Sequence, residues 1–60
     1  MKPIYAHTVQ KLINGVWYYI TDDGNWSDNI LEAKTWLRIQ YADKVSMKHL
    51  GAVVSSHKVG

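Results

Sequence analysis

Alternating apolar and polar positions flank an Asn-Gly pair in the first third of the chain. Asn14 and Gly15 separate two runs rich in β-branched and aromatic residues, residues 9–13 and 16–20. Both turn residues tolerate positive φ, as a two-residue type I′ turn requires, so the pattern predicts a β-hairpin. The turn also fixes the register of the two strands. The predicted pairs are Ile13 with Val16, Leu12 with Trp17, Lys11 with Tyr18, Gln10 with Tyr19 and Val9 with Ile20.

This register sorts the hairpin side chains onto two faces, because side chains alternate along a strand. The face expected to form the core carries Val9, Ile13, Val16, Tyr18 and Ile20, with Lys11 as the exception. The other face carries Leu12, Trp17 and Tyr19 among polar residues. Such a face is typical of an interface with another protein or with a second copy, since Trp and Tyr are enriched in binding hot spots. The alternative is that the final strand or a loop covers it within the monomer.

The segment after the hairpin is ambiguous. Composition predicts a turn at residues 21–25. Residues 27–36 fit either the capped start of a long helix or a short strand at residues 32–36. We favour the strand, because an uninterrupted helix would be apolar nearly all round. Whether Trp36 belongs to the core or to an interface stays open at this point.

Helical spacing of apolar residues predicts a helix from Arg38 to Leu50, with Gly51 as its C-cap. Residues 52–59 read as a final strand. Together the elements predict a single α+β domain over residues 1–60. It has an antiparallel sheet led by the hairpin, one packed helix and the order β-β-(β)-α-β.

The small size of the chain favours association with a partner. A chain of 60 residues buries only about 60% of its surface on folding and is marginally stable alone. It has no Cys, so neither disulfides nor thiolate metal sites can add stability. Burial against a second copy or another protein would compensate, and we expect a homo-oligomer.

No part of the sequence predicts membrane insertion or export. No apolar run approaches the roughly 18 residues that a membrane span needs. Met1, Lys2 and Pro3 are not followed by the apolar stretch of a signal peptide. We therefore expect a cytoplasmic protein.

The sequence does not predict an enzyme, a metal site or a cofactor. A nucleophile needs an adjacent base, but neighbouring residues such as Ser56 and His57 point to opposite faces of a strand. The three His residues are not linked by metal-ligand spacing, although extending the hairpin register places Asp22 opposite His7. The acidic turn at residues 22–25 lacks the ligand alternation of a calcium loop.

Nucleic-acid binding is a weaker alternative. The formal net charge is only +2, which does not imply nucleic acid by itself. Helical spacing nevertheless places Arg38, Tyr41, Lys44 and Lys48 within about a third of the helix circumference. These basic residues could contact phosphates, and exposed aromatic rings could stack on bases.

A set of turn, cap and core residues gives the chain a likeness to known proteins. The set comprises Ile20-Thr21, Gly24, Trp26-Ser27, Ala33-Lys34, Trp36, Ala42 and residues 50–54. It resembles a pattern in small phage-encoded accessory proteins and spans about two-thirds of the chain. Those with known roles commonly antagonise host systems by binding a host protein or by sequestering a small signalling molecule. The resemblance implies a role of that kind in the host cytoplasm, but it assigns no target and no functional residue.

Three hypotheses for function follow. The first is a non-catalytic inhibitor that binds and blocks a host protein through Leu12, Trp17 and Tyr19. The second is an oligomer that sequesters a small nucleotide, with an aromatic ring stacked on the base and Arg38 or a Lys on the phosphate. The third is a small nucleic-acid-binding module.

Overall fold

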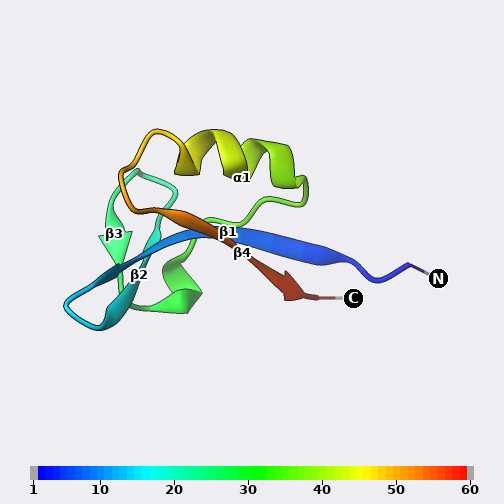
Figure 1. The fold of residues 1–60 in the computed structure, drawn as a ribbon. Helices are drawn as coiled ribbons and strands as arrows, with labels where there is room; N and C mark the ends of the chain where they lie inside the picture. Colours follow the sequence, from blue (N-terminus) through cyan, green and yellow to red (C-terminus); the bar gives the residue numbers. More distant parts are fainter. Residues whose placement is uncertain (1, 60) are drawn as a thin grey trace.

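Four strands form one antiparallel sheet, and the α-helix covers one of its faces (Figure 1). The computed structural model describes residues 2–59. The sheet order is β3-β2-β1-β4. In chain order the elements are β1 (Tyr5–Ile13), β2 (Val16–Ile20), β3 (Trp26–Ser27), the 3-10 helix η1 (Ile30–Glu32), α1 (Ile39–Ser46) and β4 (Val53–Lys58). The predicted α+β fold, with a hairpin-led antiparallel sheet and one packed helix, is therefore confirmed.

The β1–β2 hairpin has the predicted turn. Asn14 and Gly15 have φ of 51° and 80°, both positive as a type I′ turn requires. The ladder runs from Ile13–Val16 to Gln10–Tyr19, in the predicted register. It stops one pair short of the prediction, since Val9 and Ile20 are not paired in it.

Beyond that point β2 diverges from β1. Residues 33 and 34 continue beside the end of β2, and Trp36 takes the place of β2 beside β1. The Lys34 amide donates to the Ile20 carbonyl at 2.9 Å, while His7 and Trp36 exchange two backbone hydrogen bonds of 2.7 and 2.9 Å. The predicted position of Asp22 opposite His7 is therefore wrong, because Trp36 occupies it. The predicted strand at residues 32–36 is also wrong. Its residues form only isolated bridges, and the third strand is β3.

The helix is shorter than predicted, because the chain tightens after Ser46. The Ser46 hydroxyl donates to the Asp43 carbonyl at 2.8 Å. The amides of Lys48 and His49 bond to carbonyls three residues back, at 3.1 Å each, which is the tighter 3-10 pattern. Leu50, predicted on the apolar side of the helix, is instead fully exposed in the following turn.

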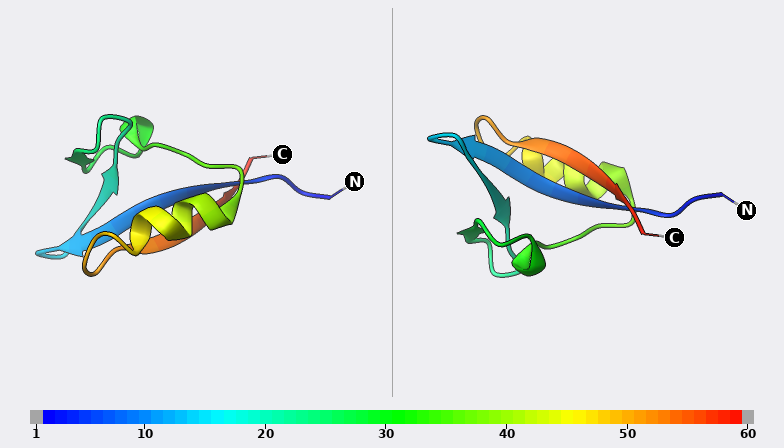
Figure 2. Two further views of the ribbon diagram at one scale, coloured as in Figure 1. Left: turned by 90° about the horizontal axis from the view of Figure 1, so that it is seen from above. Right: turned by 90° about the horizontal axis from the view of Figure 1, so that it is seen from below.

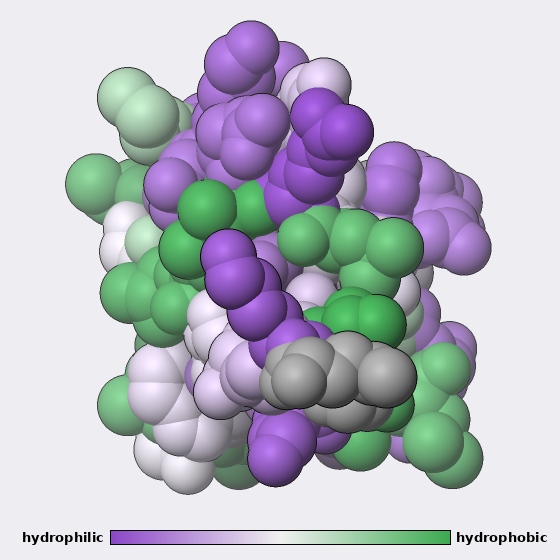
Figure 3. Space-filling model, turned by 90° about the vertical axis from the view of Figure 1, so that its right-hand side faces the viewer, coloured by the Kyte–Doolittle hydropathy of each residue, from purple (hydrophilic) through white to green (hydrophobic). Residues whose placement is uncertain are grey.

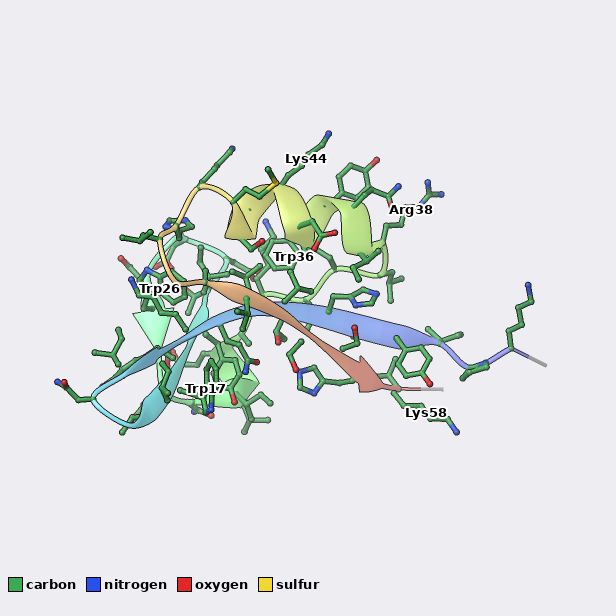
Figure 4. All side chains as sticks on the ribbon, viewed as in Figure 1. Trp17, Trp26, Trp36, Arg38, Lys44 and Lys58 are labelled. Carbon is green, nitrogen blue, oxygen red and sulfur yellow. The ribbon has the colours of Figure 1, made fainter. Side chains whose placement is uncertain are left out.

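The core lies between α1 and the sheet and is small. Val9, Ile20 and Ala42 form its buried centre. Trp26, Trp36, Val45, Ala52 and Val54 pack against that centre and are partly buried. Trp36 is therefore part of the core, between α1 and the sheet (Figure 4). Ile13 and Val16, which the sequence predicts in the core, are exposed because the hairpin tip extends beyond α1 (Figure 2).

Candidate functional site

The sheet face opposite α1 presents two large apolar side chains from adjacent strands. Leu12 is paired with Trp17, and their exposed fractions are 55% and 42%. The backbone hydrogen bonds between His7 and Trp36 lie on the β2 side of β1. The backbone amides and carbonyls of the odd-numbered β1 residues therefore point toward β2. Leu12 and Trp17 are therefore a non-hydrogen-bonded pair, the kind whose side chains lie closest. Trp17 projects on the side of the sheet away from α1 and Trp36 (Figure 4).

Tyr19 follows on the same face and is half-buried beside Gln10. The alternation of β2 places it two residues from Trp17, so both rings lie on the face away from α1. We call Leu12, Trp17 and Tyr19 the hairpin face. The register predicted this placement, and both Leu12 and Trp17 remain exposed within the described chain.

The 3-10 helix η1 borders this surface and was missed by sequence reasoning. It contacts β2 and lies on the side of the sheet away from α1 (Figures 1 and 2). Leu31 in η1 is 90% exposed. Its backbone amide donates to the side chain of Asn29 at 3.0 Å, so a cap starts η1 here. Asn29, a residue that commonly caps helices, was the available sequence signal for η1. Residue propensities alone, however, cannot distinguish a single 3-10 turn from the start of a long helix.

A polar network occupies the other end of the same face. The Thr8 hydroxyl donates to Gln10 Oε1 at 3.2 Å and lies 3.1 Å from His57 Nε2. Thr8 therefore connects Gln10 and His57 on this face of the sheet. Thr8 is buried, and its hydrogen-bonding capacity is satisfied within the sheet. The apolar hairpin face is therefore bounded on this side by polar groups that are already paired.

The predicted basic surface is only partly assembled. Arg38 stands at the N-cap of α1, and Tyr41 and Lys44 are exposed on it, with Lys44 Nζ 5.9 Å from the centre of the Tyr41 ring. Lys48 lies in the turn after α1 and does not belong to the helix. Arg38 and Lys44 project from the outer side of α1 (Figure 4), and the upper part of the view in Figure 3, on the side of α1, is mainly hydrophilic.

The His residues form separate contacts with other side chains. His49 packs edge-on against Trp26, with ring centres 5.3 Å apart, and Lys11 Nζ lies 4.6 Å from the centre of the Trp26 ring. His7 Nδ1 lies 2.8 Å from the Ser56 hydroxyl. Across residues 2–59, no three His, Asp or Glu side chains gather closely enough to bind a metal ion.

The acidic turn forms the wall of an open depression of about 690 Å³. The Asp23 carboxylate accepts hydrogen bonds from the Thr21 hydroxyl and from the Asn25 side chain. These bonds, the one from Thr21 above all, hold the pKa of Asp23 below its usual value of 3.8. Glu32 accepts from the Ser27 hydroxyl at 3.3 Å. Two of the carboxylates in the depression therefore stabilise the loop itself.

Comparisons with protein-family models, with curated proteins and with solved structures find no match for this chain. The resemblance to phage accessory proteins thus stays a prediction. Among the described residues, no helix is both long enough and apolar enough to cross a membrane.

Proposed function

We propose that this protein is a non-catalytic binding domain that blocks a host protein through its hairpin face. One observation carries the proposal: Trp17 and Leu12 are adjacent, exposed and held on paired strands. Trp is among the residues that contribute most to protein interfaces. A role as an antagonist of the host follows from the phage resemblance.

The position of the hairpin face on two paired strands lowers the cost of binding. The strands hold the backbone of Leu12, Trp17 and Tyr19 in one conformation, so little backbone freedom is lost on association. Trp and Tyr also have few rotatable bonds for the area that they contribute. Exposed Leu31 on neighbouring η1 would extend the contact area.

The shape of the surface favours a protein over a small molecule. Small-molecule sites are concave and bury most of the ligand. The hairpin face is instead the outer side of a two-stranded ladder, with the half-buried Tyr19 at one end and the turn at the other. A surface of this kind can pack against the surface of another protein, which would enclose the central Trp17.

The test compares two exposed aromatic residues on opposite sides of the molecule. Trp17→Ala removes the centre of the hairpin face, whereas Tyr41→Ala removes a ring of similar exposure, 49%, from α1. A partner recovered from host lysate is purified and titrated against each variant. We expect Trp17→Ala to weaken binding by about thirtyfold or more and Tyr41→Ala to leave it unchanged.

The opposite ranking of the two variants would contradict the proposal, as would equal binding by both. Each variant must first give the circular dichroism spectrum and thermal unfolding of the unsubstituted protein. Because Trp17 is exposed, its replacement should change the free energy of unfolding little.

Nucleic-acid binding is the second candidate, favoured by the exposed Arg38 and Lys44 around Tyr41. Neutralising phosphates releases counterions, so such binding would weaken steeply with salt and would be lost in an Arg38→Ala, Lys44→Ala variant. Retention on DNA or RNA that does not respond to salt would remove this candidate. Native mass spectrometry of the purified protein also tests for a sequestered nucleotide.

A further inference from the structure

The outer edge of β4 is the second unpartnered feature of the molecule. β4 is the last strand of the sheet, and no strand within residues 2–59 lies on its other side (Figure 2). The Val59 amide donates to the Ile4 carbonyl at 2.8 Å. Polar groups alternate direction along an antiparallel strand. The amides and carbonyls of Val54, Ser56 and Lys58 therefore point away from β1, along the open edge.

This edge has few of the features that prevent strand addition. Proteins protect sheet edges with proline, bulges, inward charges or a covering segment. β4 contains no proline, and its six residue pairs with β1 are not interrupted by a bulge. When His57 is neutral, Lys58 is the one charged residue of this strand. Ser56, in the middle of the outward set, is exposed. The edge can accept another antiparallel strand without rearrangement.

We propose that β4 pairs antiparallel with β4 of a second copy, about a twofold axis beside Ser56. In this register the residues that point outward form three hydrogen-bonded pairs between the two copies. Ser56 pairs with Ser56 of the second copy, and Val54 of each copy pairs with Lys58 of the other. Each pair exchanges two backbone hydrogen bonds, which gives six in total. Ser55 faces His57, and Val53 faces Val59. Each copy contributes four strands, so one sheet continues through the dimer.

The side-chain pairs of this register argue for a second copy as the occupant. The two Lys58 side chains lie at opposite ends of the paired strands, and each faces a valine, so like charges are kept apart. Val53 and Val59 are 47% and 61% exposed in the monomer and would cover each other across the interface. A chain with so small a core also gains stability when it buries surface in a symmetric dimer.

The proposed dimer does not depend on the hairpin face. A twofold axis perpendicular to the sheet keeps both copies of α1 on one side, and both hairpin faces on the other. Trp17 is therefore absent from the β4 interface. Variants of Ser56 therefore test the dimer, whereas Trp17→Ala tests host-protein binding, so the two proposals can fail independently.

A charge-swap experiment tests the axis. Ser56 meets its own copy, so Ser56→Lys and Ser56→Glu each place like charges opposite one another and should weaken the dimer by about tenfold or more. An equal mixture should restore it as a heterodimer, measured by native mass spectrometry and sedimentation. The matched pair Ser55→Lys and Ser55→Glu faces His57, and mixing these variants should not favour a heterodimer to the same extent.

Cysteine cross-linking provides a second test of the dimer. Replacing Ser56 removes its hydrogen bond with His7, but cross-linking reports only whether the two introduced thiols are close. The chain has no Cys, so Ser56→Cys introduces a single thiol. Across a hydrogen-bonded pair the Cα atoms are about 5.5 Å apart, within disulfide reach. Ser55→Cys would lie about 7–8 Å from its copy and should cross-link far less. A monomer at every concentration, or a dimer that neither Ser56→Lys nor Ser56→Glu weakens and Ser56→Cys does not cross-link, would overturn the proposal.

Discussion

Three tryptophans in this chain have three different environments. Trp26 and Trp36 both pack against the core, and Trp26 also contacts Lys11 and His49. Trp17 remains exposed on the hairpin face. Only Trp17 could be placed from sequence, because its face follows from a turn two residues away. The surroundings of the other two depend on the path of residues 26–36, which no local pattern determines.

Burial distinguishes two valines of the hairpin. Val9 is fully buried beside Ile20 and Ala42, whereas Val16 is exposed at the hairpin tip. We expect Val9→Ala to lower the free energy of unfolding by about 2 kcal/mol through lost burial and a cavity. Val16→Ala should change it by less than about 0.5 kcal/mol. Urea unfolding followed by circular dichroism measures both, and similar losses would contradict the described core.

The acidic turn makes a prediction about pH. Hydrogen bonds lower the pKa of Asp23 in the folded state, so the ionised carboxylate stabilises the turn. This contribution is complete above the unfolded pKa and is lost as the pH falls through the lower, folded pKa. A carboxyl NMR titration should give a pKa below 3.8 for Asp23, and Thr21→Ala should raise it toward that value. A pKa that Thr21→Ala leaves unchanged would show that the hydroxyl is not the cause.

Among the elements, the hairpin could be predicted because its signal is local, whereas the path of the segment that follows it could not. The Asn14-Gly15 hairpin was predicted with its register, because turn chemistry and alternation act within a few residues. The path of residues 27–36 was not predicted, because it depends on backbone hydrogen bonds of Lys34 with Ile20 and of Trp36 with His7. Trp36 can pair with His7 of β1 only because β2 has diverged from β1 at that point. A single sequence carries no local signal of that divergence.

The helix α1 begins without a side-chain cap. Arg38 occupies its N-cap position, and its side chain makes no capping hydrogen bond. Ser at this position can accept from a backbone amide of the first turn. We expect Arg38→Ser to raise the free energy of unfolding by about 1 kcal/mol. Lys44→Ser, inside the helix, should lower it by about 0.5 kcal/mol, so thermal unfolding should separate the two variants in opposite directions.

The whole molecule is elongated, with extents of 39 × 21 × 21 Å, and this shape explains its small core. The hairpin tip and the ends of β1 and β4 extend past α1 (Figure 1), so their apolar residues have nothing to pack against. Fold class and the orientation of the hairpin face could be predicted from sequence. The open β4 edge could not, because it depends on the order of strands in the sheet.

If β4 pairs between copies, stability must depend on protein concentration. The unfolding temperature should rise by about 3–5 °C for each tenfold increase in concentration. Ser56→Lys should remove this dependence, and its unfolding temperature should be lower by a constant amount at every dilution, because the hydrogen bond between Ser56 and His7 is lost. Differential scanning calorimetry over a concentration series gives both values, and a constant unfolding temperature for the unsubstituted protein would contradict the dimer.

The position of β1 between β2 and β4 has a consequence for biosynthesis. β1 pairs with β4 from Tyr5–Lys58 to Gln10–Val53, so one of its edges has no partner until the ribosome has translated and released residues 53–58. The hairpin can form before the rest of the sheet, but β1 gains its second partner only once residues 53–58 are available to pair. Chains arrested at Gly51 should therefore exchange the even-numbered amides of β1 as fast as an unstructured peptide does.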